Sequence, residues 1–366
     1  MGLSGPVLLS AGGTGGHLFP AEALALELKA RGHGVHLVTD TRAEKFAGHF
    51  PAEKIHVVPS ATIGSKNPIN VARALWKLWR GYRSAGTLVR SIRPAAVVGF
   101  GGYPTVPPLM AAVGADVPAI IHEQNGVMGR ANRLLAGRVD RIAGGFLKAA
   151  GPHAGKIVEV GNPARKSVID LAGTPYDTPT PEGELRVLVF GGSQGARYFS
   201  EGVPEAIALL PEGLRRRLKL VQQARPEDEE GLKARYAEMG VSAEVAAFFS
   251  DLPARMAKAH HVLSRSGAST VNELAIIGRP AILVPLPHAL DDDQGHNARI
   301  LVDADGALMR RQPDITAQSL AADLETLLSD PARLEAMARG AASTGRTNAT
   351  QLLADLVEAI AAGTEK

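Results

Sequence analysis

Two glycine-rich stretches in this chain have the composition of phosphate-binding loops. Residues 11–17 follow the apolar run 7–10, and residues 191–197 follow the apolar run 186–190. A glycine loop between a strand and a helix lets the backbone approach a phosphate, and it aims free N–H groups and the helix dipole at the anion. One such loop alone is more often a tight turn, but two loops in matching places favour phosphate or nucleotide binding.

A nicotinamide dehydrogenase is the obvious alternative for these loops. Asp40 closes the second apolar run at about the distance where an acid would bind a ribose. The glycine spacing argues against this class, because Leu18 takes the place of the third glycine after Gly13 and Gly15, and Ser193 interrupts the second loop. No Walker lysine follows either loop. The sequence therefore disfavours both a dinucleotide-dependent redox enzyme and a P-loop nucleotide hydrolase.

His17, directly after Gly16, is the candidate for acid–base chemistry in the first loop. Imidazole titrates near working pH, so this side chain could take a proton from an attacking hydroxyl. The alternative is a histidine at a helix N-terminus that only orders the loop. We predict that His17 is the general base.

The elements that must position these residues form two similar halves. Short β-rich runs alternate with helical stretches in each half, which predicts two doubly wound α/β domains. At 366 residues with 45% hydrophobic content, the chain is long enough to fill two cores. The predicted strands are residues 7–10, 35–39, 55–59, 95–100, 119–122 and 157–160, followed by 186–190, 218–222, 262–264 and 281–285.

We place the first domain at residues 1–162 and the second at residues 163–346. The turn-rich segment 173–184 carries three prolines and is predicted to be the linker, with its earlier edge at Asn162-Pro163. An alanine-rich amphipathic helix at residues 347–366 has no strand after it. We expect this helix to pack back on the first domain.

Charge and cysteine content narrow the functional class. Cysteine is absent, which excludes disulfides, thiolate metal sites and a cysteine nucleophile. The net charge is +3, but residues 1–162 hold 18 Lys and Arg against 9 Asp and Glu, so the first half should meet an anionic partner. The charge-free stretch 94–115 contains too many prolines and glycines for a membrane-spanning helix, and it predicts a buried strand, a glycine turn and a short helix.

Several further strings make the sequence similar to a known family. They are Phe100-Gly101-Gly102-Tyr103-Pro104, His122-Glu123-Gln124-Asn125, Gly161-Asn162-Pro163-Ala164-Arg165, Ser264-Arg265-Ser266-Gly267-Ala268 before Asn272-Glu273, and Asp293-Gln294 before Asn297-Ala298. With the two glycine loops, they resemble the MurG family in the same order from about Val7 to Ala307. The resemblance implies the GT-B fold, in which two Rossmann-like domains face each other across a cleft.

The activity that this resemblance implies is an inverting hexosyltransferase. The enzyme would move N-acetylglucosamine from UDP-N-acetylglucosamine to the 4-hydroxyl of the muramyl sugar of undecaprenyl-pyrophosphoryl-MurNAc-pentapeptide, which converts lipid I to lipid II in peptidoglycan synthesis. It would lie peripherally on the cytoplasmic face of the bacterial inner membrane, without a cofactor or a nucleic-acid partner, near other proteins of cell-wall synthesis. A UDP-N-acetylglucosamine 2-epimerase, which uses a related fold, and a regulatory nucleotide-binding module are the alternatives.

The resemblance also assigns individual residues to the substrates. Ser193 and Arg165 would bind the diphosphate, and Glu273 would accept hydrogen bonds from the ribose unless it caps its own helix. Phe249 stands where the family reads the uracil with backbone groups, although a buried strand-end phenylalanine is the alternative. Two neutral amides, Asn125 and Gln294, suit sugar hydroxyls and the acetamido group. The remaining substrate-binding residues are Thr14, Gly15, Gly16, Tyr103, Ala268, Ser269, Thr270, Val271 and Asn272.

The acidic run Asp291-Asp292-Asp293 invites a metal hypothesis. Carboxylates can hold a divalent ion against a diphosphate. Helix N-termini and an arginine already supply positive charge, and the resemblance implies a metal-independent enzyme. We therefore predict a solvated turn here and no metal site.

A basic stretch in the first half is predicted to contact the membrane. From residue 54 to residue 115 the chain has no acidic side chain. Basic residues and tryptophan recur there at helical spacing, and such a face suits an anionic lipid surface. The alternative is a core helix whose solvated side is basic. The predicted membrane-contacting residues are Arg73, Trp76, Lys77, Trp79, Arg80 and Arg83.

Overall fold

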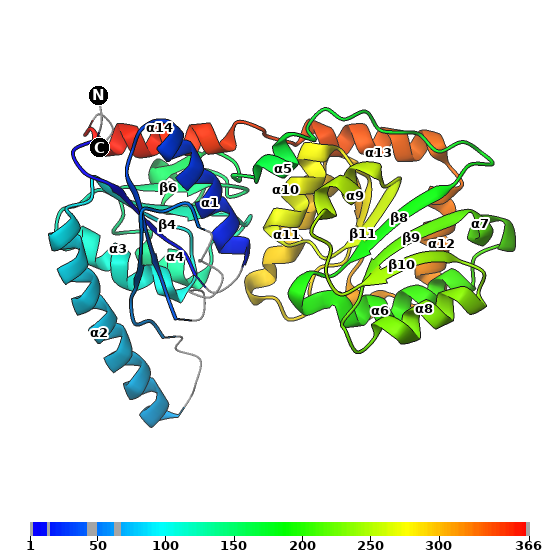
Figure 1. Ribbon diagram of the computed structural model, residues 1–366, viewed down its shortest axis with the longest axis horizontal. Coiled ribbons are helices and arrows are strands. Elements are labelled where there is room, and N and C mark those ends of the chain that lie inside the picture. Colours follow the sequence, from blue (N-terminus) through cyan, green and yellow to red (C-terminus); the bar gives the residue numbers. More distant parts are fainter. Residues whose placement is uncertain (1–2, 13–14, 42–49, 62–66, 364–366) are drawn as a thin grey trace. The chain divides into compact units, whose positions relative to one another are not determined.

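The computed structural model describes residues 3–12, 15–41, 50–61 and 67–363 (Figure 1). The chain divides into two compact units. Unit 1 comprises Met1–Arg165 together with Thr347–Lys366, and unit 2 comprises Lys166–Arg346. Each unit has its own parallel sheet, covered by helices on both faces.

Unit 1 is built on a seven-stranded parallel sheet of order β3-β2-β1-β4-β5-β6-β7 among the residues described. The central strands are buried along their whole length, as their continuous apolar runs predict. The order runs outward in both directions from β1 and β4, which defines a doubly wound domain. The strands are β1 (Val7–Ser10), β2 (Val35–Thr39), β3 (Lys54–Val57), β4 (Ala96–Gly99), β5 (Ala119–Glu123), β6 (Arg141–Gly144) and β7 (Ile157–Glu159).

Alternate residues of these strands face two separate cores. Leu9 and Val98 pack under α1 (Gly15–Ala30) and α14 (Ala349–Ala361), whereas Leu8 and Val97 pack under the helices of the opposite face. Those helices are α2 (Pro68–Ile92), α3 (Val106–Val113) and α4 (Arg130–Leu135), and the 3₁₀ turns η2 (Tyr103–Thr105) and η3 (Ala154–Lys156) complete the unit.

Helix α14 comes from the end of the chain but belongs to unit 1. Its apolar side, including Leu353 and Val357, is fully buried in the same core as α1. Polar contacts reinforce this packing, because the Arg31 guanidinium lies 2.6 Å from the Asp355 carboxylate and 2.7 Å from that of Glu358. The helix therefore packs beside α1 and covers part of one face of the first sheet.

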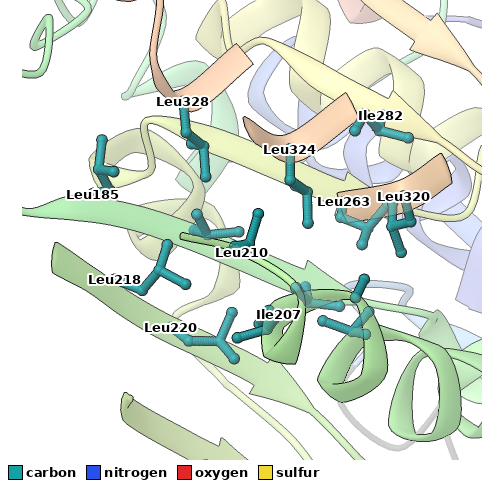
Figure 2. Close-up of a cluster of buried hydrophobic side chains, with 14 of the residues drawn as sticks. Leu185, Ile207, Leu210, Leu218, Leu220, Leu263, Ile282, Leu320, Leu324 and Leu328 are labelled. Carbon is teal, nitrogen blue, oxygen red and sulfur yellow. The ribbon is translucent and has the colours of Figure 1, made fainter. Parts of the chain in front are cut away.

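Unit 2 repeats the plan with a six-stranded parallel sheet of order β10-β9-β8-β11-β12-β13 among the residues described. Leucines of α12 meet residues of α6 and of the central strands in one continuous core (Figure 2). The strands are β8 (Leu185–Phe190), β9 (Leu218–Gln223), β10 (Ser242–Ala246), β11 (His261–Ser264), β12 (Ala281–Leu283) and β13 (Ala307–Met309). The helices are α5 (Lys166–Ile169), α6 (Gly192–Ala208), α7 (Glu212–Arg217), α8 (Glu229–Glu238), α9 (Leu252–Lys258), α10 (Ala268–Ile277), α11 (Asp293–Val302), α12 (Ala317–Leu328) and α13 (Pro331–Ser343), with 3₁₀ turns η4 (Leu290–Asp292) and η5 (Gln312–Asp314).

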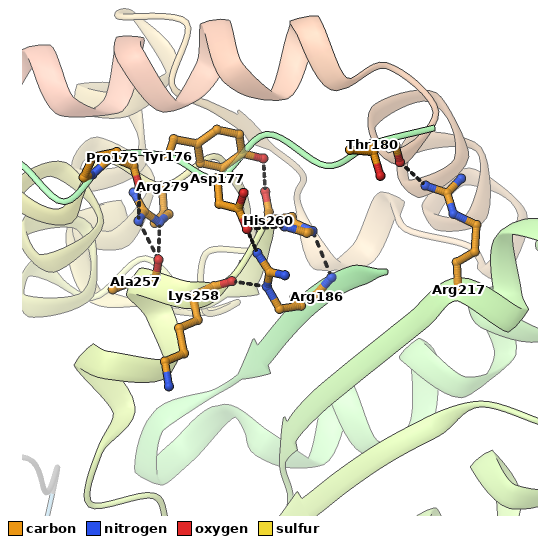
Figure 3. A network of polar contacts seen from close by, with 10 residues as sticks. All are labelled: Pro175, Tyr176, Asp177, Thr180, Arg186, Arg217, Ala257, Lys258, His260 and Arg279. Carbon is orange, nitrogen blue, oxygen red and sulfur yellow. Dashed lines mark hydrogen bonds and ion pairs between the residues drawn. The ribbon is translucent and has the colours of Figure 1, made fainter. Parts of the chain in front are cut away.

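The segment 173–184, predicted to be a linker, is instead a fixed part of unit 2 (Figure 3). The buried guanidinium of Arg279 donates to Pro175 O and Ala257 O, and Tyr176 Oη donates to His260 O at 2.8 Å. Farther along, Arg217 donates to Gly183 O at 2.8 Å. The chain changes units at Arg165–Lys166, close to the earlier edge that Asn162-Pro163 marks.

The predicted fold class of two doubly wound α/β domains is confirmed. Among the helices that the structure describes, none is both long enough and apolar enough to cross a membrane.

Candidate active site

The sheet of unit 1 changes direction between β1 and β4. In doubly wound sheets, ligands bind beyond the carboxyl ends of the strands at such a switch point. The chain leaves these two ends at residues 11–12 and at residues 100–102, which belong to the first glycine-rich stretch and to the Phe100-Gly101-Gly102 string. Thr14 lies outside the described residues, whereas Gly15 and Gly16 form the first two positions of α1.

His17 is the third residue of α1, and its imidazole lies against the loop after β4. A Cβ on Gly101 would stand 3.2 Å from His17 Cε1, and the positive φ of 91° at this position also requires glycine. Burial is the largest influence on the imidazole and lowers the pKa of His17, although the carboxylate of Glu123 acts in the opposite direction. The ring is therefore neutral at pH 7 and able to accept a proton.

Glu123, which the sequence reasoning left without a role, is the hydrogen-bonding centre of this region. Its side chain is 2% exposed. Oε1 accepts from the backbone N and Nδ2 of Asn125 at 3.1 and 3.0 Å, and Oε2 accepts from Gly129 N and Asn132 Nδ2 at 2.8 and 2.9 Å. Glu123 thus fixes Asn125 and the loop that follows β5. The available signal was a carboxylate at the carboxyl end of an apolar strand.

His122 and Gln124 connect the end of β5 to neighbouring loops. His122 Nε2 donates to Gly161 O at 3.1 Å, and Gln124 Nε2 donates to Phe100 O at 2.9 Å. Burial lowers the pKa of His122 to about 4, so its ring is a neutral hydrogen-bond donor. These contacts show that His122 and Gln124 hold the neighbouring loops against the end of β5.

Tyr103 and Arg165 lie at the ends of two of the loops in unit 1. Tyr103 begins η2, directly after Gly101 and Gly102. The Arg165 guanidinium stacks 4.4 Å from the ring centroid of Phe19, a partly exposed residue of α1. This stacking orients a planar donor next to the first turn of α1.

The sheet of unit 2 changes direction between β8 and β11, and two predicted groups of site residues follow these strands. Ser193 is the second residue of α6, and its side chain lies outside the described part of the structure. The other group forms the first six positions of α10: Ala268, Ser269, Thr270, Val271, Asn272 and Glu273. The amino ends of α6 and α10 therefore lie at the carboxyl edge of the same sheet, the edge at which doubly wound domains bind their ligands.

The position of Glu273 argues against the capping alternative. Unpaired N–H groups occur in the first four positions of a helix, whereas Glu273 is the sixth residue of α10 and is buried. Glu273 therefore lies beyond the turn whose N–H groups a capping side chain would reach.

Phe249 and Gln294 lie beyond β10 and β12, at the same edge of the sheet. Phe249 is buried, with the Arg255 guanidinium 4.4 Å from its ring centroid, while its neighbour Phe248 is 76% exposed. Gln294 is the second residue of α11, and its Oε1 accepts from Leu286 N at 2.9 Å.

The acidic run before α11 makes contacts within the protein. The carboxylate of Asp292 pairs with both terminal nitrogens of Arg311, and Asp293 Oδ1 accepts from Gln294 N at 2.7 Å. In the part of the chain that the structure describes, no three His, Asp or Glu side chains come together as metal ligands would.

The predicted membrane-contacting side chains all lie exposed on α2. Trp76 and Trp79 are 60% and 53% exposed. The Arg80 guanidinium stacks 4.9 Å from the ring centroid of Trp76, and the Arg83 guanidinium stacks 5.2 Å from that of Trp79. The amino-terminal half of this helix extends beyond the rest of unit 1 (Figure 1).

Comparisons with known proteins agree with this arrangement. The glycosyltransferase family 28 N-terminal domain matches residues 7–144, and the family 28 C-terminal domain matches residues 186–353. Among solved structures, MurG of Acinetobacter baumannii has a TM-score of 0.79 and 28% identity, covering 96% of this chain and 99% of that one. A UDP-GlcNAc 2-epimerase of Neisseria meningitidis reaches a TM-score of 0.64 at 14% identity, covering 97% and 99%, and so shares the fold alone.

Sequence identity distinguishes an N-acetylglucosamine transferase from an epimerase. The UDP-N-acetylglucosamine--N-acetylmuramyl-(pentapeptide) pyrophosphoryl-undecaprenol N-acetylglucosamine transferase of Rhizobium meliloti is 58% identical over 360 residues, which cover 98% of this chain and 96% of that protein. The enzyme of the same name from Agrobacterium fabrum is 58% identical over 361 residues, covering 98% and 95%. The chain therefore belongs to this family of N-acetylglucosamine transferases, within glycosyltransferase family 28.

Proposed function

We propose that this protein transfers N-acetylglucosamine from UDP-N-acetylglucosamine to the 4-hydroxyl of the muramyl sugar of undecaprenyl-pyrophosphoryl-MurNAc-pentapeptide, with inversion at the anomeric carbon. The observation that carries this proposal is 58% identity over nearly the whole chain to transferases named for this donor and acceptor. The reaction is a step of peptidoglycan synthesis.

His17 is the proton acceptor in the proposed mechanism. The lowered pKa of His17 keeps its imidazole neutral at pH 7. As the acceptor oxygen forms its bond to the anomeric carbon, the imidazole takes the hydroxyl proton, and the bond to UDP breaks on the opposite face of the sugar. Asn125, held by the carboxylate of Glu123, supplies an amide for sugar hydroxyls. Thr14, Gly15, Gly16 and Tyr103 complete the proposed contacts of unit 1.

Unit 2 provides the proposed donor site. The amino-terminal turn of α6 with Ser193 binds the diphosphate, Glu273 accepts from the ribose, and backbone groups at Phe249 read the uracil. Ala268, Ser269, Thr270, Val271 and Asn272 form the wall around the ribose and phosphates, and Gln294 binds the sugar. The buried carboxylate of Glu273 and the two helix N-termini at one sheet edge support this assignment.

The leaving diphosphate is stabilised by protein groups in this proposal. The first N–H groups of α6 and the planar guanidinium of Arg165 are the positive groups assigned to it. Transfer should therefore continue in EDTA at the rate measured without it. Strong inhibition that magnesium reverses would instead assign Asp291 and Asp293 to a metal.

We further propose that unit 1 binds the cytoplasmic face of the inner membrane through α2. The exposed Trp76 and Trp79, each stacked with an arginine, and the absence of acids from residue 54 to residue 115 support this. Indole rings favour the interface, and each basic side chain near an anionic surface contributes roughly 1 kcal/mol. The lipid-linked acceptor would be met at the same surface.

A transfer assay distinguishes the proposed function from its alternatives. Parent protein is incubated with UDP-N-acetylglucosamine labelled in the sugar and with a lipid-linked muramyl-pentapeptide acceptor. A transferase moves the label into the lipid only when the acceptor is present. An epimerase changes the sugar without acceptor, and a regulatory module binds the nucleotide without turnover; either result would refute the proposal.

A further inference from the structure

The loop between β12 and α11 has an unusual backbone. His288, Asp291 and Asp292 have φ values of 65°, 57° and 53°, and none of them is glycine. L side chains seldom adopt this left-handed region, so surrounding contacts must hold the loop in place. The loop leads directly into the first turn of α11, where Gln294 lies.

One ion pair holds the end of this loop. Arg311 Nη2 lies 2.6 Å from Asp292 Oδ2, and Arg311 Nη1 contacts Oδ1 of the same carboxylate. Although Asp292 is the N-cap residue of α11, its side chain makes no capping bond there and faces Arg311 instead. The guanidinium of Arg311 lowers the pKa of Asp292, so the pair stays charged across the physiological range.

Arg311 extends from a firmly anchored segment. Its neighbour Arg310 forms two bonds of 2.7 Å with the carboxylate of Asp323 on α12. On the other side, Gln312 Oε1 accepts from Nη2 of the buried Arg265 at 2.6 Å, and Arg265 belongs to the loop after β11. The pair therefore ties the loop before α11 to the scaffold of unit 2.

The pair lies directly over the first turn of α11. A Cβ on the buried Gly295 would stand 2.6 Å from Arg311 Nη2 and would collide with both carboxylate oxygens of Asp292. A side chain at this position would therefore force the ion pair to shift away from the turn that carries Gln294. The amide of Gln294 is itself oriented, because Oε1 accepts from Leu286 N and Nε2 is left to donate to a sugar oxygen.

We propose that Asp292 and Arg311 are positioning residues for the donor sugar: their ion pair, seated on Gly295, fixes the left-handed loop and so aims the amide of Gln294. This inference rests on the proposed function, in which Gln294 binds the sugar of UDP-N-acetylglucosamine. The proposal assigns the pair no contact of its own with the nucleotide or the reacting atoms. Its loss should weaken recognition of the sugar and leave recognition of UDP unchanged.

The test measures the dissociation constants of UDP-N-acetylglucosamine and of UDP by calorimetry for Arg311→Ala, Gly295→Ala and the double variant. Each single change should weaken UDP-N-acetylglucosamine binding about 3- to 10-fold, the range for one lost neutral hydrogen bond, and should alter UDP binding less than 2-fold. The double variant should be no weaker than the worse single variant, because both changes remove the same contact.

Two further variants keep the result interpretable. Asp292→Asn retains one of the two acceptors for Arg311 and a side chain that tolerates positive φ, so its loss of sugar-nucleotide binding should be smaller than that of Arg311→Ala. Arg339→Ala removes a comparable surface pair with Glu335 on α13 and should change nothing. Equal losses for UDP and UDP-N-acetylglucosamine, additive losses in the double variant, or unchanged binding in folded Arg311→Ala would each overturn the inference. Because these are binding measurements, a parent that bound the sugar nucleotide but failed to transfer it would refute the proposed function alone.

Discussion

The imidazole of His17 lies against the backbone of Gly101 and Gly102, in a place where burial holds its pKa below 6.5. If it is the general base, His17→Ala should lower the rate of the chemical step by roughly 100- to 10,000-fold. Affinity for UDP should change little, since the groups assigned to the nucleotide belong mainly to unit 2. Single-turnover transfer and calorimetry with UDP measure the two quantities separately.

An asparagine at the same position separates a base from a residue that only orders the loop. Asparagine keeps a hydrogen-bonding side chain but cannot take up a proton near neutral pH. We expect His17→Asn to stay as slow as His17→Ala and to lose the limb of the pH–rate profile that rises with deprotonation. Recovery of much of the parent rate by His17→Asn would falsify the base assignment.

Glu123 should influence catalysis through the charge that it places near His17. Its carboxylate raises the pKa of His17 against the larger effect of burial. In Glu123→Gln this opposing effect is gone, so the pKa of His17 falls and the rising limb of the pH–rate profile moves to lower pH. The profile of kcat/KM measures the shift. A limb that stays in place, with only the amplitude reduced, would limit Glu123 to holding Asn125 and the loop after β5.

At the scale of an element, α2 presents the basic and aromatic side chains of unit 1 to solvent. Replacing Lys77, Arg80 and Arg83 with glutamate reverses the local field, so binding to vesicles of anionic lipid should fall while UDP affinity in solution is retained. The two tryptophans of the chain, Trp76 and Trp79, both lie in α2, so their emission should shift to the blue when the parent binds.

A matched control changes the same number of charges elsewhere. Arg216, Arg333 and Arg339 are exposed on helices of unit 2, and their replacement with glutamate should leave vesicle binding close to that of the parent. Equal loss in both triple variants would attribute the effect to net charge. Equal binding by parent and α2 variant, at low and at physiological salt, would leave α2 as a solvated basic face.

At the scale of the whole molecule, buried histidines should make the free energy of unfolding depend on pH. Burial lowers the pKa of His122 in unit 1 and of His260 and His261 in unit 2 to about 4. The unfolded chain binds these protons near pH 6.5, so it takes up more protons than the folded chain between pH 6.5 and 4. The contribution of these histidines to the free energy of unfolding should be greatest above pH 6.5. It should decrease below that pH, by up to about 1.4 kcal/mol per pH unit for each histidine.

His261 offers a direct test of this dependence. It is fully buried in β11, and neither ring nitrogen has a hydrogen-bond partner within the described structure. Replacement with methionine removes one titrating group. Unfolding of unit 2 should then take up about one proton fewer, so its free energy of unfolding should depend less steeply on pH. Hydrogen exchange of the β11 amides between pH 4 and 7 measures it. An unchanged slope would show that His261 does not contribute.

The fold class and most strands could be predicted from the sequence, but three strands were not predicted. Continuous apolar runs identified the central strands, because parallel strands buried on both faces carry little else. β6, β10 and β13 were not predicted: β6 and β10 mix alanine or glycine with charged residues, and β13 is only three residues long. β10 and β13 are the edge strands of their sheet, where neighbours supply the pairing that local composition does not encode.

The sequence by itself determined which groups are present for binding and chemistry. These are two glycine loops, an imidazole beside the first loop, a carboxylate near the second, amide side chains, and a basic helix with tryptophan. These follow from local composition and spacing. The tertiary structure decided which charged side chains hold these residues in place. Glu123 organises Asn125, Arg279 fixes the presumed linker, and Arg311 reaches Asp292 across 19 residues of chain. Such contacts join separate elements, and only folding brings their partners within hydrogen-bond distance.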